Sequence, residues 1–384
     1  MSIYLDHSAT TPVSSRARAA IEEVLTTNYG NPSSLHRMGL NAEKAIKDAR
    51  KKIAKTLNVS DRAVVFTSGG TEANNLAIFG AIRQERGRII TTAFEHPSVL
   101  TTMNYLEKEG YDVIYLPINN SGHIEIEDLK NALSPETQLV SIMFVNNEIG
   151  SIQAIDRIAD ILDSFNLQHQ ARVRFHVDAV QAYGKIPINL KMIKVDALTI
   201  SAHKINGLKG SGALIKSDRL DVKARTFGGG QEQGIRPGTE NIIGIVAFGE
   251  AAEASYEQMT EHFAHAEKLK QALISKLISI EGIVVNGDEP QSPYILNLSF
   301  EGIKAEVMLH TLEMSGIYVS TGSACHSKKT SQSHVLNAMG LTQSKIEGAI
   351  RISFGATNTM DEIEIAADKL LSSYNDLKKL MKRR

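Results

Sequence analysis

The sequence has a single cysteine, Cys325, in 384 residues, no tryptophan, and aromatic residues at only 5 %. One cysteine excludes an internal disulfide, so the fold needs no oxidising compartment. Neither charge is in excess, with 42 basic and 43 acidic residues, which gives no argument for a nucleic-acid or membrane partner. No apolar run is long enough to span a bilayer, and the start, MSIYLDHSATTPVSS, lacks the features of a secretory signal. These absences favour a cytoplasmic protein of enzyme size.

Short apolar segments alternate with amphipathic helical patterns along most of the chain. The apolar segments, rich in β-branched residues, are 63–68, 88–93, 112–117, 138–145, 173–179 and 196–204. The helical patterns lie at 15–27, 41–57, 71–84, from Pro97, near 125–133 and at 154–165. Strands separated by amphipathic helices are typical of a parallel sheet covered on both faces. We therefore predict an α/β fold with a mostly parallel sheet.

The pattern changes near residue 241, where a helical pattern rich in Ala, Glu and Lys runs over 241–280. Beyond it, strands at 294–300 and 351–354 mix with helices at 304–315 and 361–381. We place a domain boundary near residue 260. The prediction is an N-terminal arm over 1–15 that packs with the small domain, a large domain over 16–260, and a smaller α+β domain over 261–384.

The segment VVFTSGGTEANN (64–75) has the order strand, glycines, helix. Gly69 and Gly70 allow a tight turn, and Thr71 can cap the following helix. The free N–H groups at such a helix start form an anion site that suits phosphate. The alternative is a glycine turn with a capped helix and no ligand, and this segment alone does not decide between them.

Three further residues lie at predicted strand or helix ends, where an open α/β sheet places its sites. Asp178 ends a strand and can pair with a protonated ring nitrogen or a metal, or simply cap a helix. Lys204 directly follows the strand in TISAHKINGLKGSGALI (199–215) and is a candidate Schiff-base nucleophile, or a surface lysine. His96 precedes Pro97 and can lie over a ring, or only start a helix. Together with the anion site, these groups fit one ligand, pyridoxal 5′-phosphate (PLP).

The chain resembles the NifS/IscS-like cysteine desulfurases, a group of the class V aminotransferase branch of fold-type I PLP enzymes. The resemblance covers nearly the whole chain and many motifs in order: YLDHSATTP, GNPSSLH (30–36), TSGGTEANN, EHPSV (95–99), VNNEIGSIQ (145–153), HVDAVQAYGK (176–185), SAHKINGLKGSGAL (201–214), GGGQEQGIRPGTEN (228–241), STGSACHS (320–327) and RISFG (351–355). It implies a large PLP-binding domain, a smaller α+β domain that carries the cysteine loop, and a homodimer.

The resemblance assigns four residues to the cofactor ring. Lys204 resembles the lysine that binds the cofactor covalently, and Asp178 resembles the partner of the pyridine nitrogen. Gln181 resembles the hydrogen-bond partner of the ring oxygen O3′. His96 resembles the histidine stacked on the ring, which the family also uses in proton transfer.

Other residues resemble those that bind phosphate and substrate. The phosphate ligands within one chain correspond to Gly70, Thr71, Ser201 and His203. Thr239 resembles the phosphate ligand that the second subunit supplies. Asn147 and Arg351 resemble the clamp on the α-carboxylate of the substrate, for which a guanidinium suits because it can form two parallel bonds.

Cys325 resembles the catalytic cysteine of the family. Its thiolate takes sulfur from L-cysteine as a persulfide, and alanine is released. The neighbours Gly322, Ser323 and Ala324 restrain the chain little, and His326, Lys328 and Lys329 favour the thiolate electrostatically. A free cysteine is more often a small buried hydrophobe, but the polar surroundings of Cys325 argue against that here. No metal site is expected, although a transient iron–sulfur contact at Cys325 is possible.

The long spacing from Cys325 to SHVL (333–336) places the chain in the NifS/IscS group rather than the SufS-like group. The family default for the sulfur acceptor is an iron–sulfur scaffold. The basic residues after Cys325 also resemble desulfurases that feed tRNA thiolation, so this alternative stays open. Two further alternatives are a selenocysteine lyase or another class V PLP enzyme, and a non-catalytic sulfur-relay or interaction protein.

Overall fold

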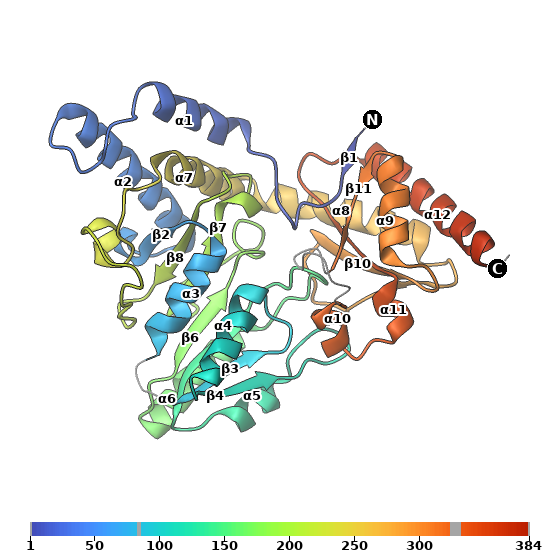
Figure 1. The fold of residues 1–384 in the computed structure, drawn as a ribbon, viewed down its shortest axis with the longest axis horizontal. Helices are drawn as coiled ribbons and strands as arrows, with labels where there is room; N and C mark the ends of the chain where they lie inside the picture. The colour runs from blue at the N-terminus through green and yellow to red at the C-terminus, as the bar shows by residue number, and fades with distance from the viewer. Residues whose placement is uncertain (1, 83–85, 323–331, 383–384) are drawn as a thin grey trace.

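The computed structural model describes residues 2–82, 86–322 and 332–382, which form sheets of seven, four and two strands with helices packed around them (Figure 1). No helix in these ranges is long and apolar enough to cross a membrane. The helices are α1 (Ser15–Thr26), α2 (Arg37–Leu57), α3 (Gly70–Ala81), α4 (Pro97–Lys108), α5 (Ile126–Ala132), α6 (Ile155–His169), α7 (Ile242–Glu257), α8 (Met259–Leu277), α9 (Ala305–Met314), α10 (His334–Ala338), α11 (Gln343–Glu347) and α12 (Met360–Lys382).

The larger sheet has seven strands in the order β2-β8-β7-β6-β5-β3-β4. Only β8 runs antiparallel to its neighbours, which confirms the predicted mostly parallel sheet. The sequence analysis did not predict β8, although it quoted the motif that contains it. The strands are β2 (Val64–Thr67), β3 (Arg88–Thr92), β4 (Asp112–Leu116), β5 (Thr137–Met143), β6 (Arg174–Asp178), β7 (Ala197–Ser201) and β8 (Gly212–Lys216).

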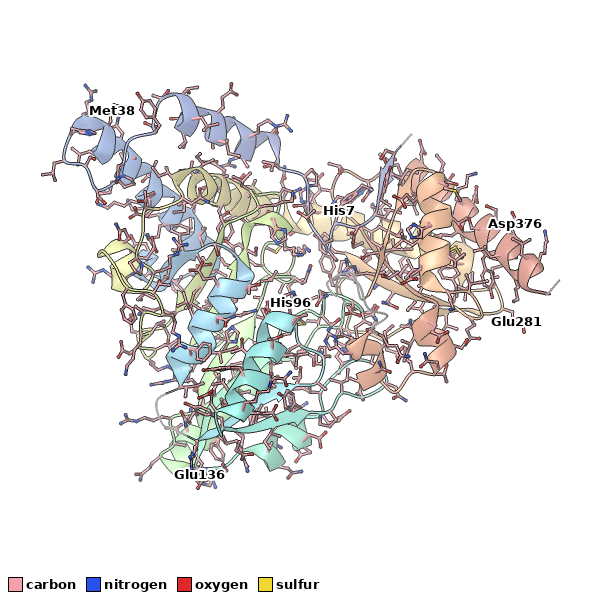
Figure 2. All side chains as sticks on the ribbon, in the orientation of Figure 1. His7, Met38, His96, Glu136, Glu281 and Asp376 are labelled. Atoms are coloured by element: carbon pink, nitrogen blue, oxygen red, sulfur yellow. The ribbon has the colours of Figure 1, made fainter. Side chains whose placement is uncertain are left out.

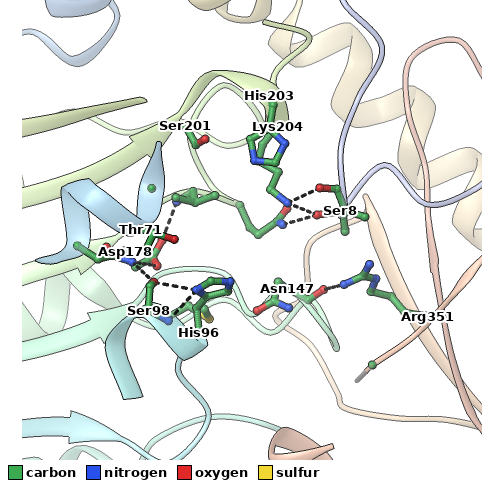
Figure 3. Close-up of a pocket in the computed structure, with 17 residues that line it drawn as sticks. Ser8, Thr71, His96, Ser98, Asn147, Asp178, Ser201, His203, Lys204 and Arg351 are labelled. Atoms are coloured by element: carbon green, nitrogen blue, oxygen red, sulfur yellow. Dashed lines mark hydrogen bonds between the residues drawn. The ribbon is translucent and has the colours of Figure 1, made fainter. Parts of the chain in front are cut away.

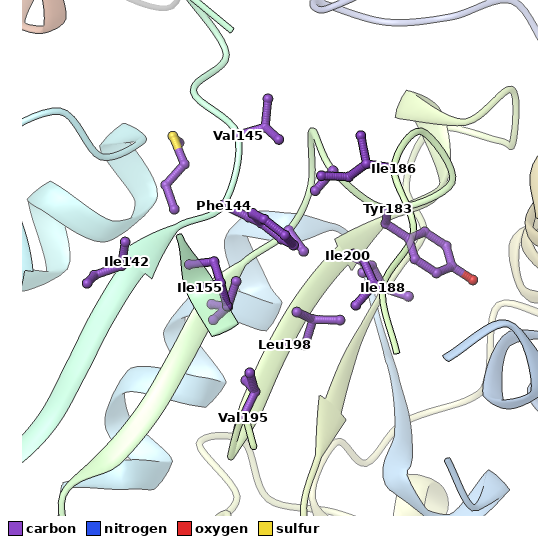
Figure 4. Close-up of a cluster of buried hydrophobic side chains, with 14 of the residues drawn as sticks. Ile142, Phe144, Val145, Ile155, Tyr183, Ile186, Ile188, Val195, Leu198 and Ile200 are labelled. Carbon is purple, nitrogen blue, oxygen red and sulfur yellow. The ribbon is translucent and has the colours of Figure 1, made fainter. Parts of the chain in front are cut away.

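Helices cover both faces of this sheet, because its strands are apolar on both sides. Val65 packs with α3 and α4 on one face, whereas its neighbour Val64 packs with α2, α6 and α7 on the other. Leu198 and Ile200 of β7 belong to the second face, together with Tyr183 (Figure 4). The parallel direction of β2, β3, β4, β5, β6 and β7 places their carboxyl ends at one edge of the sheet.

The predicted helix over 241–280 is two helices in the structure. α7 ends at Glu257 and α8 begins at Met259, with Gln258 at φ −105° and ψ 5° between them. α7 packs against α1 and α2, whereas α8 packs against α12. The two helices thus bury their apolar faces against different partners, and no glycine or proline marks the break in the sequence.

The C-terminal part forms a four-stranded antiparallel sheet in the order β12-β13-β10-β9, packed against α8, α9 and α12. Near the amino terminus, β1 pairs in parallel with β11, and Asp6 bridges to Ser353. The first residues of the chain therefore lie beside its last third, while the predicted domain boundary near residue 260 stays a prediction. The remaining strands are β1 (Ile3–Tyr4), β9 (Ile283–Val285), β10 (Ile295–Phe300), β11 (Ile317–Tyr318), β12 (Ser320–Thr321) and β13 (Ala349–Ser353).

Candidate functional site

A cavity of about 330 Å³ lies where the carboxyl edge of the large sheet meets the N-terminal segment and β13 (Figure 3). Figure 2 places His96, one of its residues, near the middle of the molecule. Apart from Cys325 and Thr239, every residue that the sequence analysis assigned to a site lines this cavity: Gly70, Thr71, His96, Asn147, Asp178, Gln181, Ser201, His203, Lys204 and Arg351. Ser8, Ala9, Asn74, Ser98, Met143, Val180 and Gly322 complete the lining.

Lys204 follows β7 directly and points its Nζ into the cavity. Nζ donates to the carbonyl oxygens of Ser8 at 2.5 Å and Ala9 at 2.8 Å. Gln181 Nε2 donates to the same Ser8 oxygen at 3.0 Å. The N-terminal segment is therefore part of the site. The sequence analysis quoted YLDHSATTP but gave Ser8 and Ala9 no role, because a backbone carbonyl leaves no signature in a sequence.

Asp178, the last residue of β6, is buried and has two donors on its carboxylate. Asn74 Nδ2 donates to Oδ2 at 2.7 Å, and the backbone N–H of Val180 donates to Oδ1 at 3.0 Å. N–H donors therefore hold both carboxylate oxygens at the cavity wall. Asn74 was missed as a site residue, although it lies within the quoted TSGGTEANN.

A chain of polar side chains joins Asp178 to His96. Asn74 Nδ2 also contacts Ser98 Oγ at 2.8 Å, and Ser98 Oγ lies 2.8 Å from His96 Nδ1. The backbone N–H of Ser98 donates to the same Nδ1 at 3.1 Å, which makes Nδ1 an acceptor and leaves the proton on Nε2. Burial lowers the pKa of His96, and nearby Lys204 lowers it further against the opposing effect of Asp178. The His96 ring is therefore neutral near pH 7.

The start of α3 forms one end of the cavity. The helix begins at Gly70, and its N-cap is Gly69, which has no side chain to accept a hydrogen bond. Thr71 therefore does not cap the helix, contrary to the expectation from sequence, because it lies inside the first turn. The first N–H groups of α3 are left for a ligand, as an anion site requires.

Two residues around β7 complete this end of the cavity. Ser201 Oγ is buried and has no hydrogen-bond partner in the described part of the chain. A buried hydroxyl without a partner is costly, and an anion that accepts from it would remove that cost. His203 Nδ1 lies 3.2 Å from Thr10 Oγ1, and burial, with Lys204 and two further lysines, lowers the pKa of His203 to about 4. The residues present thus fit a phosphate group.

Arg351 of β13 forms the opposite end of the cavity, and its side chain is only 6 % exposed. One terminal nitrogen donates to Asp6 Oδ1 at 2.7 Å, and the other donates to the backbone oxygen of Asn147 at 3.1 Å. Its buried Nε has no partner within the described ranges. The guanidinium therefore keeps donors for a further anion such as a carboxylate.

Cys325 lies outside the described residues, as do Ser323, Ala324, His326, Lys328 and Lys329. Gly322, the last residue described before this segment, lines the cavity. A Cβ at Gly322 would overlap the carboxylate of Glu148, so the close approach requires glycine.

The carboxylate of Glu148 also contacts Ser333, which follows the segment of Cys325 in the sequence. Ser333 Oγ donates to Glu148 Oε2 at 2.5 Å. Burial raises the pKa of Glu148 to about 7, against the lowering effects of Ser333 and nearby Arg351. Glu148 was missed by the sequence analysis, which singled out only its neighbour Asn147.

Thr239 does not line the cavity of its own chain. It is exposed and lies near Ser68 and Gly210, in the segment anchored by Glu232, whose carboxylate pairs with Arg50 and accepts from the backbone N–H of Phe66.

Comparison with known proteins gives one consistent picture. Residues 3–365 match the model of the family described as aminotransferase class V. The chain is 41 % identical over 375 residues to cysteine desulfurase IscS of Clostridium botulinum, covering 96 % of this chain and 93 % of that protein. It is 41 % identical to putative cysteine desulfurase IscS 1 of Bacillus subtilis, covering 95 % and 96 %. The solved structure of a NifS-like protein superposes with a TM-score of 0.90 at 37 % identity, covering 98 % of this chain and all of that one.

Proposed function

The chain belongs to the aminotransferase class V family and is a PLP-dependent cysteine desulfurase with the fold-type I architecture, and on this premise we propose which of its residues bind cofactor and substrate. The observation that carries the proposal is the cavity in which ten of the twelve predicted site residues meet. A selenocysteine lyase or another class V enzyme is not favoured, because the relatives at about 40 % identity are named cysteine desulfurases.

PLP, when bound, supplies an electron sink that makes the α-proton of an amino acid acidic. We assign its phosphate to the start of α3, with Gly70, Thr71, Ser201 and His203 as ligands. The support is the uncapped helix start and the unpartnered Ser201 hydroxyl.

Lys204 and Asp178 enter the cavity from adjacent strands, β7 and β6. We assign Lys204 to covalent attachment of the cofactor and Asp178 to its ring nitrogen. The two hydrogen bonds on the Asp178 carboxylate fix its position at the cavity wall, as such a pairing needs. Gln181 is the donor for the ring oxygen.

We assign the transfer of protons in the cavity to His96. Its Nδ1 is occupied by Ser98, so Nε2 is the nitrogen left to exchange a proton in the cavity. In this tautomer Nε2 carries the proton, so the neutral ring can donate that proton into the cavity and can take one back at Nε2 only after it has donated. The Asn74–Ser98 chain links the ring to Asp178, which opposes the lowering effect of burial on the pKa of His96.

Arg351 and Asn147 hold the α-carboxylate of L-cysteine. Arg351 has a buried Nε without a partner in the described part, and its terminal nitrogens keep further N–H groups. Charge-assisted hydrogen bonds from the guanidinium of Arg351 would both attract the carboxylate and fix its orientation. Asp6 keeps the guanidinium in place when no substrate is bound.

Cys325 receives the sulfur. L-cysteine and the Cys325 thiol give L-alanine and a persulfide on Cys325, which balances without any added oxidant or reductant. The support is that Gly322, three residues before Cys325 in the sequence, lines the cavity.

A homodimer completes the site in this proposal, with Thr239 of the second subunit as a phosphate ligand. Two observations support it: Thr239 is exposed outside the cavity of its own chain, and large apolar side chains such as Leu35 and Phe227 are exposed to solvent. Sedimentation at several concentrations tests this, and a monomer that binds PLP with full affinity would contradict it.

The sulfur acceptor that we propose is a scaffold protein for iron–sulfur cluster assembly, because the relatives carry the name IscS. An enzyme of tRNA thiolation is the second candidate, based on the basic residues after Cys325. Incubation of the PLP-loaded protein with L-cysteine, with alanine and sulfide both measured, tests the activity. Absence of both products would contradict the desulfurase. Transfer of labelled sulfur to one acceptor and not the other decides between the two.

A further inference from the structure

Lys185 is a buried lysine without a carboxylate partner. It lies on the turn after β6, is 8 % exposed, and makes one side-chain hydrogen bond, from Nζ to Gln181 Oε1 at 2.9 Å. Its Nζ also lies 5.7 Å from the centre of the Tyr294 ring. No carboxylate oxygen lies within 4 Å of this nitrogen in the described ranges. Burying an ammonium group without an ion pair costs stability, so stability alone does not explain Lys185.

The charged and titratable groups around Lys185 do not compensate for its burial. Burial, together with the cations Lys204 and Arg351, lowers the pKa of Lys185 to about 7. The two imidazoles that interact with it, His7 and His203, both have pKa values lowered to about 4 and stay neutral near pH 7. Lys185, Lys204 and Arg351 therefore concentrate positive charge near this part of the cavity, which suits an anionic ligand.

Lys185 reaches the cavity only through Gln181. Lys185 is absent from the cavity lining, whereas Gln181 belongs to it. Oε1 of the Gln181 amide accepts from Lys185, and Nε2 donates to the Ser8 carbonyl. A charged lysine can only donate, so it holds the amide oxygen away from the cavity and leaves the N–H groups facing it.

We propose that Lys185 is a positioning residue for the cofactor: it fixes the Gln181 amide so that its N–H groups face the ring oxygen, and it places a cation behind them. This inference rests on the proposed role of Gln181. A donor backed by a cation stabilises negative charge on the ring oxygen. Stabilising that charge makes the bound cofactor release its titrating proton at a lower pH.

The test compares Lys185→Met with the wild-type protein, both reconstituted with PLP. Methionine keeps the buried stem but removes the donor and the charge. The pH midpoint of the visible absorbance change should rise by about one unit, which corresponds to ~1.4 kcal/mol. The dissociation constant for PLP, measured by titrating the apoprotein, should rise about tenfold in the same comparison. An unchanged midpoint and an unchanged dissociation constant would overturn the proposal.

A matched control is available in Lys270. It is also buried, and its Nζ donates to Gln291 Oε1 at the same distance of 2.9 Å, but neither residue lines the cavity. Lys270→Met should leave both the midpoint and the PLP dissociation constant unchanged. Equal shifts in the two methionine variants would mean that loss of a buried lysine perturbs the protein generally, and the proposal would fail.

A double-mutant cycle shows whether Lys185 acts through Gln181. In a Gln181→Ala background, Lys185→Met should add a much smaller shift than in the wild-type background, because the amide that it orients is gone and only its charge remains to be lost. A full additional shift would overturn the positioning role. If Lys185→Met does not fold, Lys185→Gln replaces it: a neutral donor should keep PLP affinity near that of the wild type and raise the midpoint, and no rise would refute the inference. Failure of wild-type protein to bind PLP would instead refute the proposed function.

Discussion

Replacing Arg351 by alanine gives the sharpest test of the substrate site. The guanidinium is nearly fully buried, held by Asp6 and the Asn147 carbonyl, with its Nε free of protein partners in the described part. A carboxylate bound by two charge-assisted bonds gains at least ~1.5 kcal/mol from each. The loss of both amounts to roughly 3 kcal/mol, or about a hundredfold weaker binding. We therefore expect KM for L-cysteine to rise about a hundredfold in Arg351→Ala.

The assay is the initial rate of alanine formation over a range of L-cysteine concentrations, with PLP content measured on the same samples. Arg351 lies at the end of the cavity opposite the start of α3, so PLP content should change little. Arg351→Lys is the matched control, because it keeps the charge but cannot form two parallel bonds, and its KM should lie between those of the other two proteins. An unchanged KM in Arg351→Ala, at unchanged PLP content, would remove Arg351 from the carboxylate clamp.

Three further predictions test other parts of the site and the core. Lys204→Ala should no longer have PLP fixed to the chain by borohydride, and label on another lysine would show that Lys204 is the wrong residue. Cys325→Ser should still bind PLP but form almost no alanine and gain no sulfur mass, because a neutral hydroxyl attacks divalent sulfur poorly; full alanine turnover would contradict the nucleophile role. Burial raises the pKa of Glu95 from 4.5 to about 8, so its neutral form stabilises the fold at low pH and this contribution is lost as pH rises over that range. Between these pH values the free energy of urea unfolding should fall less steeply in Glu95→Gln than in the wild type. The exposed Glu127→Gln should fall as steeply as the wild type. Equal slopes in the wild type and both variants would refute the raised pKa of Glu95.

The strands and helices of the large sheet were predictable from sequence, because their patterns are local. The runs before Asp178 and Lys204 are apolar and β-branched, as strands buried on both faces must be. β8 is the exception, since a strand of five residues that follows a glycine-rich turn has little pattern of its own. The break at Gln258 was also unpredictable, because it comes from α7 and α8 packing on different partners.

Most of the site residues could be identified because their motifs resemble those of a known family, but their contacts could not. The sequence by itself predicted that a lysine, an aspartate and a glycine-led helix start lie at the ends of strands, and a parallel sheet brings the carboxyl ends of its strands to one edge. Only the tertiary structure decided that the Ser8 carbonyl faces Lys204, that Asn74 links Asp178 to the His96 side, and that Lys185 lies behind Gln181. Such contacts depend on how separate segments pack, and a backbone oxygen or a buried amine carries no local sequence pattern that would report it.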